Sequence, residues 1–353
     1  MNRTALVACA KSLVASGKGL LAMDESNPTC NTRFAALGIP QTVELRRAWR
    51  ELLITAPALG DSISGAILYD ETIRQRTQGG RRFVDCLIDV GIIPGIKVDI
   101  GAKPLALHAG EKVTEGLDGL RDRLGEYAGM GARFAKWRAV IGLDGGHPSA
   151  ACIRANTAAL ARYAALCQEA GIVPIVEPEV LMTGDHSLER CRFATGKVLT
   201  ALFEELAVQD VMLDGLILKA NMVLPGLDCR SQVSVQAMAA ATIDCLVESV
   251  PAAVAGIAFL SGGQPAELAS ARLAAMNDQA TNEEQGRDRL PWCLTFSFAR
   301  AIQQPALDRW RGKDGNAAEA IQVLLHRARC NRAALHGAYS ATMERDRVYE
   351  QAS

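Results

Sequence analysis

The sequence has almost no excess charge of either sign and no long apolar run. Its 353 residues carry a formal net charge of −1, so the chain lacks the one-signed field that attracts nucleic acid or a membrane surface. No apolar stretch approaches the roughly 20 residues that span a bilayer, and the N-terminus lacks the apolar core of a signal peptide. We therefore expect no nucleic-acid partner, no membrane partner and a cytoplasmic location.

The cysteines, histidines and glycines lack the spacings of disulfide, metal and dinucleotide sites. Ten cysteines are scattered without a C-x-x-C pair, which indicates free thiols in a reducing compartment. The five histidines show neither H-x-x-H nor H-x-x-x-H spacing, so the sequence predicts no metal site and no cofactor. No G-x-G-x-x-G follows the first predicted strand, and this disfavours an open sheet that binds a dinucleotide.

What the chain does have is a regular alternation of apolar and helical segments. Hydrophobic residues make up 49% and charged residues 22%, the balance of a globular protein with a large core. The ends of the apolar segments lie mostly about forty residues apart, which leaves room for a loop and a helix between strands. The predicted strands are Gly19–Asp24, Ile63–Asp70, Ile92–Asp99, Phe134–Ile141, Ile172–Val180, Gly215–Val223, Gly256–Gly263 and Pro291–Phe298.

Helical periodicity fills the segments between these strands. The predicted helices are an N-terminal amphipathic helix, Thr42–Ala56, Thr72–Val90, Pro148–Ala170, Ser187–Ala207 and Val235–Ser249, with Ala301–Trp310 and Ala317–Ala338 beyond the last strand. The polar segment 340–353 is predicted to be a flexible tail. The pattern indicates one domain over residues 1–339, a (β/α)8 TIM barrel with an extra N-terminal helix and extra C-terminal helices.

One lysine, Lys219, lies inside an apolar strand, G-L-I-L-K-A-N-M-V. Desolvating an ammonium group costs several kcal/mol and drives its pKa down. A deprotonated lysine is a nucleophile suited to Schiff-base chemistry. The residue alone leaves a second interpretation open, in which the side chain reaches solvent at the strand end or forms a structural ion pair.

Charged residues recur near the C-terminal ends of the predicted strands, where barrel enzymes place their active sites. They are Asp24, Lys97, Asp99, Lys136, Arg138, Glu177, Glu179 and Lys219. Parallel barrel strands are covered on both sides and have no exposed edge, so these charges predict one polar cluster at the mouth. Lys136 near Lys219 would disfavour the protonated form of each, and Glu177 could move protons during imine formation.

Two further sets of residues are suited to binding anions. The first is Ser261, Gly262, Gly263 and Arg300, and the second is Ser26, Arg33 and Lys97. In the first set, a glycine pair precedes a helix start whose free backbone N–H groups attract anions, and an arginine follows the last strand. Two anion sites around an imine-forming lysine indicate an enzyme for a bisphosphorylated ketose.

These segments resemble the class I, Schiff-base-forming fructose-bisphosphate aldolases. The matching strings are K-G-L-L-A-M-D-E-S, S-G-A-I-L-Y-D-E-T, P-G-I-K-V-D, F-A-K-W-R, P-I-V-E-P-E, L-K-A-N-M-V, F-L-S-G-G-Q and L-T-F-S-F-A-R-A, spread from about Leu6 to Tyr339. The resemblance implies reversible cleavage of fructose 1,6-bisphosphate to glycerone phosphate and glyceraldehyde 3-phosphate, in glycolysis and gluconeogenesis. It also implies a metal-independent homotetramer.

The resemblance further implies a role for each matching residue. Lys219 forms the imine and Glu177 is its acid/base partner. Asp24 accepts the proton of the C4 hydroxyl, Lys136 is the cation beside the reacting centre, and Glu179 lies near it. Ser261, Gly262 and Arg300 match the site of the C1 phosphate, and Ser26, Lys97 and Arg138 surround the distal part of the sugar.

The sequence departs from the family pattern at several positions. Thr32 replaces a basic residue, so the distal phosphate is expected to be held less tightly, and Ala299 replaces a glycine before Arg300. Ala220 replaces a proline, and Met23 a small residue. The chain ends in Q-A-S instead of the usual tyrosine, which leaves protonation of the enamine to an internal residue such as Tyr349.

These departures leave two alternatives to the aldolase prediction. The same chemistry could act on fructose 1-phosphate or sedoheptulose 1,7-bisphosphate, or the barrel could be a non-catalytic scaffold. The intact set Asp24, Lys136, Glu177 and Lys219 disfavours the scaffold.

Overall fold

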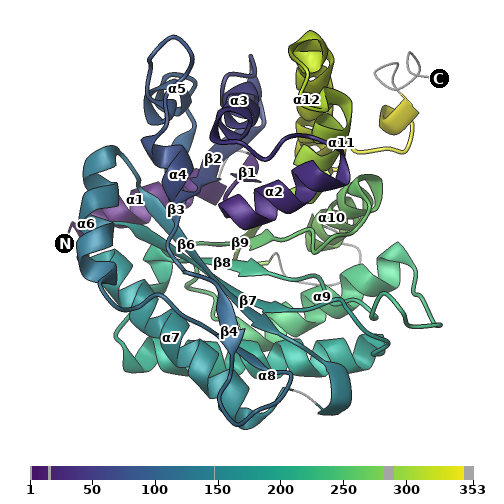
Figure 1. Ribbon diagram of the computed structural model, residues 1–353. Helices are drawn as coiled ribbons and strands as arrows, with labels where there is room; N and C mark the ends of the chain where they lie inside the picture. Colours follow the sequence, from purple (N-terminus) through teal and green to yellow (C-terminus); the bar gives the residue numbers. More distant parts are fainter. Residues whose placement is uncertain (1, 15–16, 147, 282–289, 346–353) are drawn as a thin grey trace.

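In the computed structural model, which describes residues 2–14, 17–146, 148–281 and 290–345, eight parallel strands close into a barrel (Figure 1). The order around the barrel is β1-β10-β9-β8-β7-β6-β3-β2. Their bounds are β1 Gly19–Ala22, β2 Ile63–Leu68, β3 Ile93–Lys97, β6 Phe134–Ile141, β7 Val173–Val180, β8 Ile217–Ala220, β9 Gly256–Phe259 and β10 Cys293–Phe298. The predicted (β/α)8 barrel is confirmed.

Several strands end earlier than predicted, and the difference places the polar residues. The predicted strand Gly19–Asp24 ends at Ala22, and Gly256–Gly263 ends at Phe259. The ladder stops where the strands diverge at the mouth, so Asp24 and Ser261 lie in the loops that follow. In TIM barrels these loops carry the chemistry.

Helices surround the barrel in the order expected of alternating strands and helices. Their bounds are α1 Arg3–Val14, α2 Asn27–Ala36, α3 Val43–Ile54, α4 Asp70–Arg74, α5 Phe83–Asp89, α6 Leu120–Met130, α7 Ala150–Glu169, α8 Leu188–Val208, α9 Val235–Ser249, α10 Ala266–Thr281, α11 Arg300–Trp310 and α12 Ala317–Ala334. The prediction of one helix over Thr72–Val90 is wrong. Gly80, at φ +84°, sits in a turn, and Arg76 bridges to Arg82, so the segment folds as α4 and α5.

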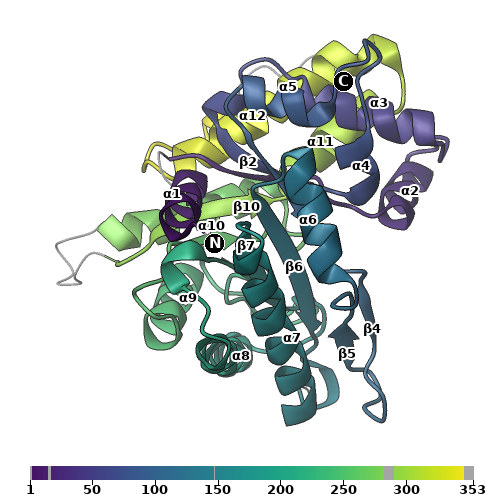
Figure 2. The same cartoon turned by 90° about the vertical axis from the view of Figure 1, so that its left-hand side faces the viewer.

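The sequence pattern did not indicate α2, α6 or a short hairpin. The hairpin pairs β4 (Ala102–Pro104) with β5 (Lys112–Thr114), and Figure 2 shows it beside α7. Its strands are too short to display alternation, and Thr114 is held by a hydrogen bond from its N–H to Asn156 Oδ1 at 3.1 Å. Helix α2 buries only Cys30 and Phe34, so its apolar periodicity is weak.

The N-terminal helix α1 closes the end of the barrel where the strands begin. Leu6, Leu13 and Val14 are buried against the barrel interior. Glycines permit this approach, because a Cβ at Gly215 would lie 2.7 Å from Leu6, and one at Gly256 would lie 2.7 Å from Val14. This end of the barrel is therefore filled by apolar side chains.

The segment predicted to be a tail is described only in its first part. Residues 340–345 form a turn that includes the 3-10 helix η6 (Met343–Arg345). Glu344 in this turn accepts hydrogen bonds from Arg327 of α12 and from the Tyr339 hydroxyl, the latter at 2.9 Å. Residues 346–353, including Tyr349, lie outside the described residues. Within the described chain, no helix is both long and apolar enough to cross a membrane.

Candidate active site

Nearly all the predicted site residues meet in one cavity at the C-terminal mouth of the barrel. The cavity has a volume of about 500 Å³. Its lining includes Asp24, Ser26, Arg33, Lys97, Lys136, Arg138, Glu177, Glu179, Lys219, Ser261, Gly262 and Arg300. Gly263 is the predicted residue that does not line it, because it lies behind the Arg300 guanidinium.

A chain of ion pairs forms the floor of the cavity. Glu177 on β7 lies between lysines from the two neighbouring strands, with Oε1 3.0 Å from Lys219 Nζ of β8 and Oε2 3.2 Å from Lys136 Nζ of β6. Lys136 Nζ also lies 2.7 Å from Asp24 Oδ2. All four side chains are buried. The strand order places Glu177 between the two lysines, and Asp24 reaches Lys136 from the loop after β1, which is not a neighbour of β6 in the barrel.

The charges of this floor stabilise one another. Burial alone would raise the pKa of Asp24 and of Glu177, but Lys136 and Lys219 outweigh burial and hold both carboxyl pKa values below their usual range. For Lys136, burial alone would lower the pKa, whereas the Asp24 and Glu177 carboxylates raise it. The expectation that Lys136 is pushed toward its neutral form by Lys219 is therefore wrong: two carboxylates keep it protonated.

Arg300 and the glycine turn form an anion-binding corner of the cavity. Gly262 and Gly263 adopt φ values of +58° and +90°, and a Cβ at Gly263 would lie 2.7 Å from Arg300 Nη2. Among the described residues, Arg300 forms no ion pair within 4.0 Å. Burial, together with Arg33 and Arg138, lowers the pKa of Arg300, so this corner carries positive charge that a bound anion would neutralise.

The cations on the opposite side of the cavity are already paired with carboxylates. Arg33 lies 2.5 Å from Glu25, and Lys97 lies 2.9 Å from Asp99. Arg138 forms an ion pair with Glu179. Thr32 donates its hydroxyl to Pro28 O at 2.9 Å within α2. An anion bound on this side would compete with these carboxylates, which makes it the weaker of the two predicted anion sites.

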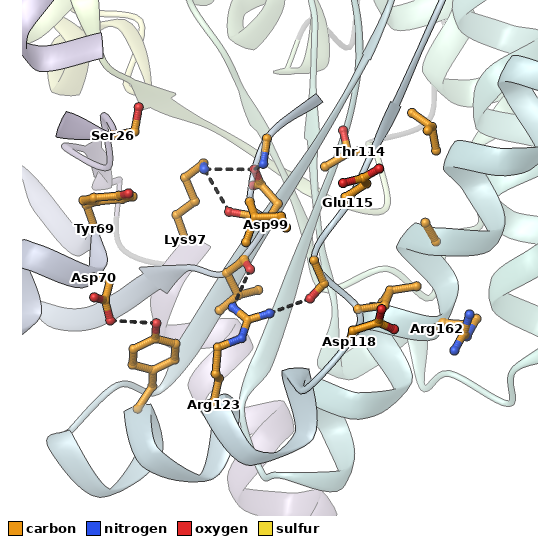
Figure 3. Close-up of a pocket in the computed structure, with 18 of the residues that line it drawn as sticks. Ser26, Tyr69, Asp70, Lys97, Asp99, Thr114, Glu115, Asp118, Arg123 and Arg162 are labelled. Atoms are coloured by element: carbon orange, nitrogen blue, oxygen red, sulfur yellow. Dashed lines mark hydrogen bonds and ion pairs between the residues drawn. The ribbon is translucent and has the colours of Figure 1, made fainter. Parts of the chain in front are cut away.

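A second hollow of about 1050 Å³ opens beside the cavity, between the β4–β5 hairpin and α6 (Figure 3). Both spaces are lined by Ser26, Lys97 and Asp99. In Figure 3 the Lys97 side chain extends between Tyr69 and Asp99, and its Nζ lies 5.9 Å from the Tyr69 ring centroid. A ligand bound in the cavity therefore has room to extend from its distal side into this second hollow.

The polar residues Ser297 and Glu25 also line this cavity and were not among the predicted site residues. Ser297 on β10 lines the cavity, and its buried Oγ has no hydrogen-bond partner among the described residues. Its signal in the sequence is alternation, since the small polar residues Thr295 and Ser297 alternate with Phe296 and Phe298. Glu25 accepts hydrogen bonds from Arg33 and, at 2.6 Å, from Arg50, and so fixes the position of Arg33 at the cavity wall. The sequence prediction named the neighbouring Asp24 and not Glu25.

Comparison with known proteins connects this geometry to one family. Residues 5–352 match the family described as fructose-bisphosphate aldolase class-I. A Xanthomonas campestris pv. campestris protein, described as a probable class 1 fructose-bisphosphate aldolase, is 54% identical over 94% of this chain and 97% of its own length. Fructose-bisphosphate aldolase 3, chloroplastic, of Arabidopsis thaliana is 47% identical over 97% of this chain and 85% of its own. The Plasmodium falciparum aldolase, solved in complex with TRAP and a small molecule inhibitor, superposes with a TM-score of 0.92 at 43% identity, covering 96% of each chain. The chain therefore belongs to the class I fructose-bisphosphate aldolase family.

Proposed function

We propose that Lys219 forms an imine with the C2 carbonyl of fructose 1,6-bisphosphate, and that the surrounding residues carry out reversible cleavage of the C3–C4 bond. The chain is a metal-independent aldehyde-lyase by its family. The observation that supports these residue roles is the buried array of Lys219, Glu177, Lys136 and Asp24 at the mouth of the barrel.

Imine formation needs a group that both accepts and returns protons next to the nucleophile. Glu177 is suited to this role, because its carboxylate lies 3.0 Å from Lys219 Nζ and is ionised in the free enzyme. It carries two protons in turn from the Lys219 nitrogen to the former carbonyl oxygen: the first completes the carbinolamine hydroxyl, and the second lets that hydroxyl leave as water. Its Oε2 has no aligned hydrogen-bond donor among the described residues, so that oxygen is available to the reacting groups.

Cleavage of the C3–C4 bond needs a base for the C4 hydroxyl and a sink for the bonding electrons. Asp24 is ionised and lies in the loop after β1, where it accepts the hydroxyl proton as the C4 carbonyl forms. The electron pair of the broken bond moves into the protonated imine and gives an enamine on Lys219. Protonated Lys136, 2.7 Å from Asp24, stabilises the negative charge around the reacting centre.

The two phosphates are assigned to opposite sides of the cavity. Arg300, with Ser261 and Gly262, is suited to the C1 phosphate because its guanidinium has no carboxylate partner in the described chain. Ser26, Arg33, Lys97 and Arg138 are assigned to the distal part of the sugar. Glu179 holds Arg138 in an ion pair there, so we assign it a positioning role.

Trapping of the imine tests the proposal. The enzyme is treated with borohydride in the presence of glycerone phosphate, and its peptides are then mapped. We expect one stable adduct, on Lys219, with loss of cleavage activity, and we expect Lys219→Met to abolish both adduct and activity. Lys197→Met removes an exposed lysine of α8 and serves as the matched control. Activity that survives in Lys219→Met, with no adduct on that peptide, would contradict the mechanism.

The relatives do not favour the two alternatives, a different phosphoketose substrate and a non-catalytic scaffold, because proteins about half identical to this chain are described as fructose-bisphosphate aldolases.

The ratio of kcat/KM for fructose 1,6-bisphosphate to that for fructose 1-phosphate measures how much the carboxylate-paired distal side contributes. A ratio well above one is expected.

We also propose a cytoplasmic homotetramer. None of the ten cysteines, all of which lie in the described residues, forms a disulfide, which suits a reducing compartment. Apolar side chains of the outer helices, Phe193 on α8 and Val247 on α9, are exposed in the single chain, as expected of surfaces that subunits cover. Light scattering coupled to gel filtration measures the assembly; the mass of one 37.7 kDa chain would contradict it.

A further inference from the structure

A second group of chemically reactive side chains lies away from the cavity, where the C-terminal turn meets α12. His326 and Cys330 are one helical turn apart on α12, and Nε2 of His326 lies 3.5 Å from Sγ of Cys330. Glu344 of the following turn places Oε2 3.8 Å from the same Nε2. All three ligand atoms lie within 4.8 Å of one another. In Figure 1 the turn, in yellow, lies beside α12.

These separations are close to the edges of a tetrahedral zinc site. Zinc binds sulfur at about 2.3 Å, imidazole nitrogen at about 2.0–2.1 Å and carboxylate oxygen at about 2.0–2.2 Å. In a tetrahedron these bond lengths place nitrogen and sulfur roughly 3.5 Å apart, and nitrogen and oxygen roughly 3.4 Å apart. The observed nitrogen–sulfur distance of 3.5 Å matches the first edge, and the observed nitrogen–oxygen distance of 3.8 Å exceeds the second by a few tenths of an ångström. The sulfur and the carboxylate oxygen lie within 4.8 Å of each other, against roughly 3.6 Å in the tetrahedron.

The carboxylate is held by two further side chains. The Tyr339 hydroxyl donates to Glu344 Oε1 at 2.9 Å, and Arg327 forms an ion pair with Oε2. The Arg327 side chain is 1% exposed and also donates to Ala266 O at 3.0 Å and to Ser270 Oγ at 2.6 Å. Such outer partners orient a ligating carboxylate, and each carboxylate oxygen has lone pairs for both a cation and a hydrogen-bond donor.

The donor set selects the class of ion. Sulfur, imidazole nitrogen and one carboxylate suit Zn²⁺, whereas Mg²⁺ and Ca²⁺ require oxygen ligands. A thiolate and a carboxylate supply two negative charges, which balance the two positive charges of the divalent ion. We propose that His326, Cys330 and Glu344 form a Zn²⁺ site, with water as the fourth ligand, that fastens the C-terminal turn to α12. The site is structural, because none of the three residues lines the catalytic cavity.

Metal binding by the full-length, tag-free enzyme tests the proposal. After treatment with a chelator and dialysis, the protein is titrated with Zn²⁺ and, separately, with Co²⁺ as a spectroscopic probe. We expect one ion per chain, a thiolate-to-cobalt charge-transfer band, and slower hydrogen exchange in residues 338–345 when Zn²⁺ is bound. Cys330→Ser should remove the cobalt band, and Glu344→Gln should weaken Zn²⁺ binding at least about tenfold.

Two controls keep the outcome specific. Cys245→Ser removes a buried thiol of α9 whose contact is the carbonyl of Arg192, and it should leave stoichiometry and the cobalt band unchanged. Glu344 lies in the C-terminal turn and not in α12, so Glu344→Gln tests the site without a substitution in the helix. A wild-type protein that binds no Zn²⁺, or a cobalt band that persists in Cys330→Ser, overturns the proposal. Neither result depends on the Lys219 chemistry.

Discussion

At the scale of single residues, Glu177 shows how one carboxylate serves two lysines. Its oxygens lie 3.0 Å from Lys219 Nζ and 3.2 Å from Lys136 Nζ. Burial opposes its charge, and the two ammonium groups together overcome burial. The pair would otherwise repel across a gap of low dielectric constant, so this carboxylate makes the close approach of the two lysines possible.

Replacement of Glu177 by glutamine should preserve the shape of the site and remove the proton carrier. We expect kcat to fall by about 10²–10⁴-fold, the usual contribution of a general acid/base, and borohydride trapping on Lys219 to slow in parallel. Steady-state kinetics and quenched-flow trapping measure the two effects. Glu71→Gln, which removes a carboxylate paired with Arg46 outside the cavity, is the control. Equal rates for Glu177→Gln and the parent enzyme would exclude the proton-transfer role.

At the scale of elements, the two ends of the barrel are lined by different kinds of residue, apolar at one end and polar at the other. Helix α1 fills the end where the strands begin, and glycines at the strand starts, such as Gly256, leave space for it. At the other end the strands finish in polar loops and the ion-paired floor. The apolar end is packed for stability and the polar end for chemistry, so substitutions at the two ends should have separable effects.

Leu13→Ala in α1 tests this separation. The side chain is fully buried among the residues that close the barrel, and its truncation should lower the free energy of unfolding by about 2–5 kcal/mol through lost burial and a residual cavity. Urea denaturation measures the loss, and kcat/KM at a temperature where both proteins are folded should change by less than about twofold. Lys11→Ala, at an exposed position of the same helix, should be nearly neutral. A large loss of activity with unchanged stability in Leu13→Ala would contradict the division between the ends.

At the scale of the whole molecule, the buried charges make stability depend on pH at both extremes. Asp24, Glu25 and Glu177 have lowered pKa values in the folded state. Their contribution is present above the unfolded values of about 3.9–4.3 and is lost as the pH falls toward the folded values. Lys136 has a raised pKa, so its contribution is present below about 10.4 and is lost as the pH rises through the folded value.

Lys136→Met should change both the free energy of unfolding at neutral pH and the steepness with which it falls at acidic pH. Without its ammonium group, Asp24 and Glu177 lose the cation that pairs with both of them, and breaking a buried pair costs about 3–5 kcal/mol at neutral pH. The folded pKa values of the two carboxyls should rise, so stability should fall less steeply between about pH 4.5 and 3. Urea titrations at a series of pH values measure both effects. Parallel curves for the two proteins would show that Lys136 does not hold these carboxyl groups ionised.

The sequence by itself determined the barrel and most of the charged residues that line the cavity at its mouth. The strand–helix alternation is a repeated local pattern, and Lys219, Glu177 and Asp24 were identifiable because charge in an apolar strand or at its end is costly unless it is used. Local signals of this kind need no knowledge of distant contacts. They were weaker for α2, whose buried face is small, and misleading for Thr72–Val90, where a glycine turn interrupts the helical pattern.

The tertiary structure decided how the charged residues pair, because pairing depends on strand order and side-chain direction across the barrel. Lys219 was expected to disfavour the protonated form of Lys136, yet Asp24 and Glu177 both form ion pairs with Lys136 and keep it charged. Arg33 and Lys97 were predicted to bind an anion, yet Glu25 and Asp99 already form ion pairs with them. His326, Cys330 and Glu344 likewise lie close together only because the C-terminal turn packs against α12. Spacing along a chain identifies candidate charges, whereas the energy of each depends on neighbours that only the folded chain brings within a few ångströms.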